Sequence, residues 1–213
     1  MKCARSMMRL YAVTDRKWVG RQSLYEQVES ALKGGATCLQ LREKDMRPED
    51  FLAEAVEIKK LCARYKVPFI IDDNVEVALK CGADGVHVGQ HDMKAGKVRE
   101  LVGPDMILGV SAHTPELAVE AERAGADYIG AGTVFPTSTK PDADFVSHGT
   151  LKAVCAAVSV PVVAIGGISG ANIMKLSGCG LAGVSVVSAL FGSPDIEKAG
   201  RELLALSDKM IKA

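Results

Sequence analysis

Cations and carboxylates follow three successive apolar runs of the chain. Arg42 and Lys44 come directly after one run, Asp72 and Asp73 close the next, and Asp92 stands a few residues past the third. Guanidinium and ammonium groups suit an oligophosphate, and Mg²⁺ in proteins is often held by one or two carboxylates together with phosphate oxygens. Each motif alone also fits a solvated turn or a helix cap, but their combination predicts a metal-assisted anion site.

Two further groups predict a second anion site. The segment Phe135–Asp142 holds hydroxyl groups and a lysine and is longer than the usual short connection, which suggests a phosphate-binding lid. The pair Gly166-Gly167 and the run Ser185–Ala189 each end an apolar segment. Glycine lets backbone N–H groups approach an anion. A tight turn would explain the glycine pair alone, but not why the Ser185–Ala189 run ends a second apolar segment in the same way. We therefore expect a pocket in which backbone N–H groups bind an anion.

A nucleophilic side chain does not stand out. Ser111 ends an apolar run but lacks a G-x-S-x-G elbow, so we expect it to hydrogen-bond a substrate. The histidines His87, His91, His113 and His148 lack metal-ligand spacing, and we expect structural or solvent-facing roles for them.

The apolar runs that carry these groups are short, rich in β-branched residues and nearly continuous in hydrophobicity, as buried parallel strands are. They lie at Arg9–Val13, Cys38–Arg42, Phe69–Asp72, Gly85–Gly89, Ile107–Ser111, Tyr128–Gly132, Val162–Gly166 and Gly183–Val187. Eight β-α units in 213 residues predict a single (β/α)₈ TIM barrel over residues 1–213. The competing doubly wound sheet would need a Gly-x-Gly-x-x-Gly turn after an early strand, and no early strand of this chain is followed by one. In a barrel, the active site lies at the C-terminal ends of the strands.

Helix signals separate the strands. Pro48–Arg64 repeats apolar residues on one face, and Thr114-Pro115 and Ser193-Pro194 each predict an N-cap followed by proline at the first helical position. Gly82 and Gly125 are expected to end helices in the left-handed region.

Composition narrows the class of protein. Lys and Arg total 26 and balance 26 acidic residues, so binding to nucleic acid or membrane is not expected. No apolar run approaches the ~20 residues of a membrane span, and we expect no signal peptide. The six cysteines form no C-x-x-C pair, which favours free thiols in a cytoplasmic protein. A homo-oligomer is compatible with the sequence, which does not determine the oligomeric state.

Several segments together resemble bacterial and archaeal thiamine-phosphate synthases, in order and over nearly the whole chain. They are Leu10–Asp15, Gln40–Lys44, Gly85–Asp92, Gly109–His113, Tyr128–Lys140, Ala164–Ser169 and Gly183–Ala189. The resemblance implies a transferase that joins hydroxymethylpyrimidine diphosphate to a thiazole phosphate, or to its carboxylated form, and releases diphosphate.

The resemblance also implies the site residues. One Mg²⁺ per subunit would lie on Asp73 and Asp92, and Ser111 would face the pyrimidine amino group. Catalytic roles would fall to Arg42, Lys44, Ser111 and Lys140. The substrate-binding set would be Gln40, Leu41, Arg42, Glu43, Lys44, Asp72, Ser111, Thr137, Ser138, Thr139, Lys140, Gly167, Val187 and Ser188. Of these, Thr137, Thr139, Gly167, Val187 and Ser188 would bind the thiazole phosphate, the last three largely through backbone N–H groups.

The chemistry implied by the resemblance is dissociative: diphosphate leaves first, and the thiazole nitrogen attacks the resulting carbocation. This agrees with the missing nucleophile. One position departs from the family pattern, because Asp72 stands where an Asn is expected. Two alternatives stay open. A thiazole tautomerase of the same fold should not need Arg42, Lys44, Asp73 and Asp92 together, and a non-catalytic paralogue would be favoured only by a damaged diphosphate site.

Overall fold

The computed structural model describes residues 3–20, 22–137 and 145–213, and it contains a closed barrel of eight parallel strands. The first and last strands pair to close the ring, with Leu10 opposite Val184. The strands are β1 (Leu10–Val13), β2 (Cys38–Leu41), β3 (Phe69–Asp72), β4 (Gly85–Val88), β5 (Ile107–Ser111), β6 (Tyr128–Gly132), β7 (Val162–Ile165) and β8 (Gly183–Val186). The predicted TIM barrel is confirmed, and no predicted strand differs from its observed counterpart by more than one residue at either end.

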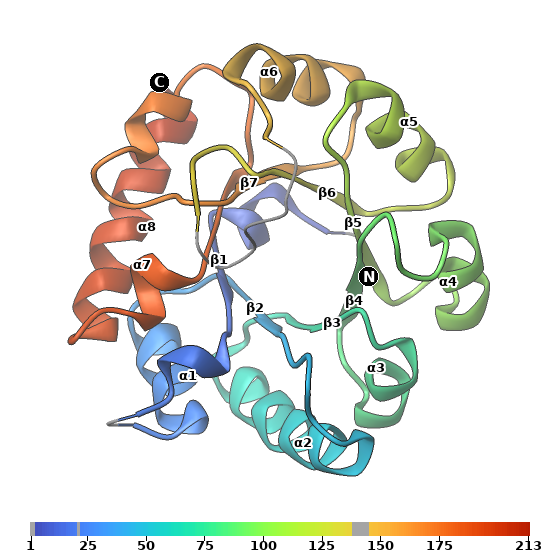
Figure 1. Ribbon diagram of the computed structural model, residues 1–213, viewed down its shortest axis with the longest axis vertical. Helices are drawn as coiled ribbons and strands as arrows, with labels where there is room; N and C mark the ends of the chain where they lie inside the picture. Colours follow the sequence, from blue (N-terminus) through green and yellow to red (C-terminus); the bar gives the residue numbers. More distant parts are fainter. Residues whose placement is uncertain (1–2, 21, 138–144) are drawn as a thin grey trace.

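Helices form a ring outside the barrel, so the outward side chains of the strands are buried (Figure 1). The α-helices are α1 (Leu24–Lys33), α2 (Pro48–Tyr65), α3 (Val75–Cys81), α4 (Ala95–Val102), α5 (Pro115–Arg123), α6 (His148–Ala157), α7 (Ser188–Phe191) and α8 (Ile196–Lys212). Short 3₁₀ helices occur at η1 (Arg5–Met8), η2 (Arg16–Trp18) and η3 (Ile173–Leu176), and η3 replaces a full helix between β7 and β8. No helix in the described ranges is long and apolar enough to cross a membrane.

The helix ends follow the local sequence, with one exception. Thr114 accepts a hydrogen bond from the N–H of Leu117, and Pro115 is the first residue of α5, as predicted. Gly82 ends α3 in the left-handed region, as expected. The prediction that Ser193 caps the last helix was wrong. Asp195 is the cap, because its carboxylate accepts from the N–H of the third helical residue and α8 begins only after it.

The barrel interior has a polar centre. Tyr11 and Tyr128 are fully buried there among aliphatic side chains. Two glycines on neighbouring strands leave room for the rings of Tyr128 and His87: a β-carbon at Gly109 would lie 2.1 Å from the Tyr128 ring, and one at Gly130 would lie 3.1 Å from the His87 ring. Aromatic residues make up only 5% of the chain, a composition that favours an aliphatic core. The outer layer fits that description, but the centre of the barrel does not.

Candidate active site

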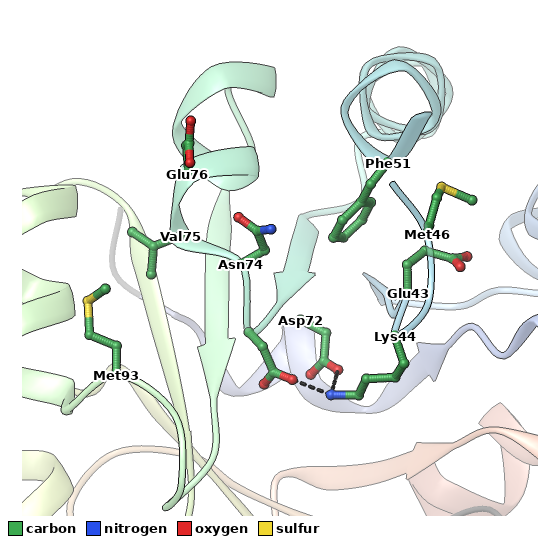
Figure 2. Close-up of a pocket in the computed structure, with 10 residues that line it drawn as sticks. Glu43, Lys44, Met46, Phe51, Asp72, Asn74, Val75, Glu76 and Met93 are labelled. Carbon is green, nitrogen blue, oxygen red and sulfur yellow. Dashed lines mark hydrogen bonds and ion pairs between the residues drawn. The ribbon is translucent and has the colours of Figure 1, made fainter. Parts of the chain in front are cut away.

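A cavity of about 460 Å³ opens at the C-terminal ends of β2 and β3. Its lining includes the cation Lys44, the carboxylates Asp72 and Asp73, and the apolar side chains of Met46 and Phe51 (Figure 2). Strand ends of neighbouring parallel strands meet at one rim of a barrel. The cationic motif after β2 and the acidic motif after β3 are therefore brought together, as the sequence predicted.

Lys44 lies between two carboxylates (Figure 2). Its Nζ is 3.3 Å from Oδ2 of Asp72 and also donates a hydrogen bond to Oδ2 of Asp73. Nε of Arg42 is 3.7 Å from the same Asp72 oxygen. The backbone N–H of Arg42 donates to Oγ1 of Thr14 at 3.0 Å, which ties the cationic loop to the end of β1. Both cations predicted to bind an oligophosphate thus rest against Asp72.

Burial is the main influence on the pKa values of the two carboxyl groups in this cluster. Asp72 is 8% exposed, and the removal of water raises its pKa although Lys44 and Arg42 act to lower it. Burial, followed by the charge of Asp72, also raises the pKa of Asp73 to about 6. The two carboxylates and two cations balance formally, and the raised pKa values indicate that burial disfavours the charged form of both carboxylates. A divalent cation beside them would favour the charged form.

The carboxylates that follow β3 and β4 meet. A side-chain hydrogen bond with Asp92 contributes to the raised pKa of Asp73. Asp73 is held in a left-handed conformation at φ 59°, and its N–H donates to the carbonyl of His87 at 2.8 Å. Asp92 also accepts a hydrogen bond from the N–H of Gly89 at 2.8 Å. It therefore also makes the local contact expected of a residue that only stabilises a turn.

The donor set fits a hard cation only in part. Across the described ranges, no three His, Cys, Asp or Glu side chains gather as a metal-binding group. Asp73 and Asp92 supply carboxylate oxygens, which Mg²⁺ prefers, but Mg²⁺ needs six ligands and commonly takes the rest from water and substrate phosphates. These residues therefore suit an ion that binds together with a phosphorylated ligand.

A hydrogen-bonded chain runs through the barrel interior to Ser111. Nε2 of Gln40 donates to Oη of Tyr11 at 2.9 Å, and that hydroxyl is 2.7 Å from Oη of Tyr128. Nδ1 of His87 is 2.9 Å from Oη of Tyr128, and its Nε2 is 2.9 Å from Oγ of Ser111. The prediction selected Gln40 and Ser111 and treated His87 as structural. It missed both tyrosines, although period-two alternation along β1 and β6 marks them as inward-facing.

Two members of the predicted β2 motif are held away from open solvent. The Glu43 side chain is 3% exposed and accepts two hydrogen bonds from the Arg16 guanidinium, at 2.9 and 3.0 Å. This ion pair ties the loop after β2 to η2. Leu41 is fully buried in the layer between barrel and helices, so only its backbone is available to a ligand.

The residues predicted for the second anion pocket come from adjacent strand ends. Gly167 follows β7, and Val187 and Ser188 follow β8, which pairs with β7. Ser188 is exposed and begins α7. Thr137 is partly exposed after β6, whereas Ser138, Thr139 and Lys140, and with them most of the predicted lid, lie outside the described residues.

Gly167 needs to be glycine for a reason that the sequence did not reveal. It has φ 63°, and a β-carbon on it would lie 2.3 Å from the carbonyl oxygen of Pro136. Its own carbonyl accepts a hydrogen bond from Nδ2 of Asn172 at 2.9 Å. The backbone of Gly167 thus packs closely against the loop after β6. This contact joins the parts of the predicted pocket that follow β6 and β7.

Comparison with known proteins agrees with this geometry. Residues 10–190 match the family model described as thiamine monophosphate synthase. A thiamine-phosphate synthase from Ruminiclostridium cellulolyticum is 48% identical over 197 residues, which cover 92% of this chain and 94% of that protein. One from Clostridium acetobutylicum is 47% identical over 201 residues, covering 94% and 95%. The solved thiamine phosphate pyrophosphorylase of Pyrococcus furiosus is 38% identical, with a TM-score of 0.89 over 97% of this chain and 98% of that one. The chain therefore belongs to the thiamine monophosphate synthase family.

Proposed function

We propose that this protein is a thiamine-phosphate synthase, a transferase that joins hydroxymethylpyrimidine diphosphate to a thiazole phosphate. The observation that supports this most directly is the cluster at the barrel mouth, where Arg42 and Lys44 face the carboxylates Asp72 and Asp73. Relatives that are named thiamine-phosphate synthase share nearly half of their residues with this chain. A tautomerase of the same fold has no use for a diphosphate-binding cluster of this kind.

The reaction needs electrostatic help rather than a nucleophilic side chain. The bond between the pyrimidine methylene carbon and the diphosphate oxygen breaks, and the diphosphate leaves with the electron pair. The lone pair of the thiazole nitrogen then forms the new carbon–nitrogen bond, so no proton transfer is required. Arg42 and Lys44 stabilise the negative charge that grows on the leaving oxygen. Lys140, outside the described residues, is proposed to reach the same diphosphate.

Mg²⁺, when bound, supplies further charge neutralisation of the leaving diphosphate. Asp73 and Asp92 are the residues that we propose to hold it, because their carboxylates meet and their environment disfavours two bare negative charges. Lys44 now pairs with Asp73, and a phosphate is the stronger partner for it because phosphate carries more charge. Ligand binding is therefore expected to move Lys44 from the carboxylates to the diphosphate.

The thiazole phosphate is assigned to the rim opposite the diphosphate. Gly167, Val187 and Ser188 offer backbone N–H groups at the ends of β7 and β8, the usual phosphate site of these barrels. Thr137 adds a hydroxyl from the loop after β6, and Gly167 packs directly against that loop. The two substrates would then enter from different strands and meet over the polar centre of the barrel.

The deciding experiment incubates the purified protein with both substrates and Mg²⁺ and measures thiamine phosphate and diphosphate. A synthase releases the two products in equal amounts. A tautomerase would convert its thiazole without forming thiamine phosphate, and a sensor would bind either ligand without turnover. Either result would contradict the proposal. Lys44→Ala is expected to lower kcat by more than tenfold, whereas Lys60→Ala, on the exposed face of α2, is a matched control that keeps it.

A further inference from the structure

We propose that Tyr11, Tyr128 and His87 are positioning residues that force Gln40 and Ser111 to present opposite hydrogen-bonding character to the aminopyrimidine. This inference rests on the proposed function and concerns the same site. The observation behind it is the unbroken chain from Gln40 to Ser111, every link of which is 2.9 Å or shorter.

Burial makes the chain obligatory. Tyr11 is 1% exposed, Tyr128 is fully buried and Gln40 is 5% exposed, so none of them can turn to solvent for a partner. A buried polar group without a partner costs about 1–3 kcal/mol. The Cys38 thiol also lies beside the Tyr11 hydroxyl, but sulfur is a weak acceptor and competes poorly with Tyr128.

The order of the protons then follows from valence. Each tyrosine hydroxyl has one hydrogen to donate, and a neutral imidazole has one donor and one acceptor nitrogen. If the Gln40 amide donates to Tyr11, then Tyr11 donates to Tyr128, Tyr128 to His87, and His87 to Ser111. The Ser111 hydrogen is left to donate into the site, and the Gln40 carbonyl is left to accept.

The opposite order is the only other complete one. Rotating the Gln40 amide by half a turn reverses every link, after which Ser111 accepts from the ligand and Gln40 donates to it. The heavy-atom distances are the same with the amide in either orientation, so the free protein is compatible with both orders. In either order the Ser111 hydrogen and the Gln40 carbonyl are either both available to a ligand or both engaged within the chain.

This pairing matches an aminopyrimidine, which carries ring nitrogens that accept and an exocyclic amino group that donates. Ser111 closes β5 and is partly exposed, whereas Gln40 lies on β2, so the two ends approach the mouth from different sides of the barrel. A β-carbon at Gly130 would crowd the His87 ring, at 3.1 Å from Cε1, and would lie 4.0 Å from Oγ of Ser111. The glycine therefore keeps open the place where the chain reaches the site.

The test breaks the chain at a residue that is buried between its two ends. Tyr128→Phe keeps the ring but removes the hydroxyl that joins Tyr11 to His87. We expect the KM for the pyrimidine diphosphate to rise about tenfold, the effect of one lost hydrogen bond, while the KM for the thiazole phosphate stays the same. Tyr25→Phe, on the exposed face of α1, is the matched control and should change neither value. An equal rise in both KM values would overturn the inference, since it would indicate a merely structural role.

Coupling to Ser111 gives the second readout. If Tyr128 acts through Ser111, then Tyr128→Phe should have little further effect in a Ser111→Ala background, whereas full additivity would contradict the chain. His87→Gln retains an acceptor and a donor and should keep more pyrimidine affinity than His87→Leu. Equal affinity of those two variants would also count against it.

A binding measurement separates this inference from the proposed function. Calorimetry with hydroxymethylpyrimidine itself, which lacks the diphosphate and cannot react, reports on the chain even if no thiamine phosphate forms. The wild type should bind this probe about tenfold more tightly than Tyr128→Phe. Equal binding by the two proteins would refute the positioning role, and a lack of turnover with unequal binding would refute only the synthase assignment.

Discussion

Replacing Asp72 by Asn should improve the diphosphate site rather than damage it. The carboxylate is 8% exposed and lies 3.3 Å from Nζ of Lys44 and 3.7 Å from Nε of Arg42. At an effective dielectric of ~20, each of these ion pairs is worth about 4–5 kcal/mol before desolvation. A diphosphate that competes for the same cations must overcome that attraction. It must also bear repulsion of about 4 kcal/mol for each unit of charge ~4 Å from the carboxylate.

Desolvation and screening reduce the net effect. Burying a carboxylate costs several kcal/mol, which offsets much of its attraction for the two cations. The remaining repulsion is screened by Lys44, Arg42 and any bound Mg²⁺, so we expect a net gain of about 1 kcal/mol, which is about fivefold in affinity. The amide of Asn adds donors that a carboxylate lacks. We therefore expect Asp72→Asn to lower the KM for the pyrimidine diphosphate several-fold and to keep kcat within about twofold.

The assay follows thiamine phosphate formation over a range of Mg²⁺ concentrations. Asp73→Asn is the neighbouring control, which should lose turnover and need more Mg²⁺. If Asp72→Asn behaves like that control, Asp72 is itself a metal ligand and the electrostatic reasoning is wrong. A wild type without activity that Asp72→Asn restores would identify the natural chain as the non-catalytic paralogue.

Three further outcomes are expected. Asp92→Ala should lower kcat strongly and move the thermal midpoint by only a few degrees. A loss confined to stability would show that Asp92 only stabilises its turn and does not hold the metal. Gly167→Ala should raise the KM for the thiazole phosphate, because the new β-carbon would meet the backbone of Pro136. Gly82→Ala is the control for backbone strain, since Gly82 has nearly the same φ and nothing within 4 Å of its β-carbon position. Equal urea midpoints and equal kinetics for the two variants would refute the role of the Pro136 contact. Burial raises the pKa of the Cys62 thiol from 9.0 to about 12, so the unfolded chain ionises first and stability should fall as pH rises from about 9 towards 12. Cys62→Ala should show a smaller fall in urea midpoint between pH 8 and 10.5, and an unchanged fall would contradict this assignment.

Much of the barrel could be predicted from the sequence because its signals are local. Strand and helix lengths follow from hydrophobic periodicity, and Thr114 and Gly82 mark helix ends through their own backbone preferences. The grouping of Arg42 and Lys44 with Asp73 was also predictable, since strand order places neighbouring strand ends at one rim. The Ser193 cap failed because Asp195, two residues later, is an equally good local cap, and the Ser193 hydroxyl instead accepts from the N–H of Asp195 at 3.2 Å.

What the sequence alone determined about this protein is the order of its elements and the residue types at each strand end. Only the tertiary structure decided which of those residues touch. The links from Gln40 to Tyr11 and from Tyr128 to His87 join residues 29 and 41 positions apart on different strands. Barrel closure sets the register of these contacts, and two glycines give them room. Such contacts depend on distances in space across the whole sheet, and no local pattern in the chain records them.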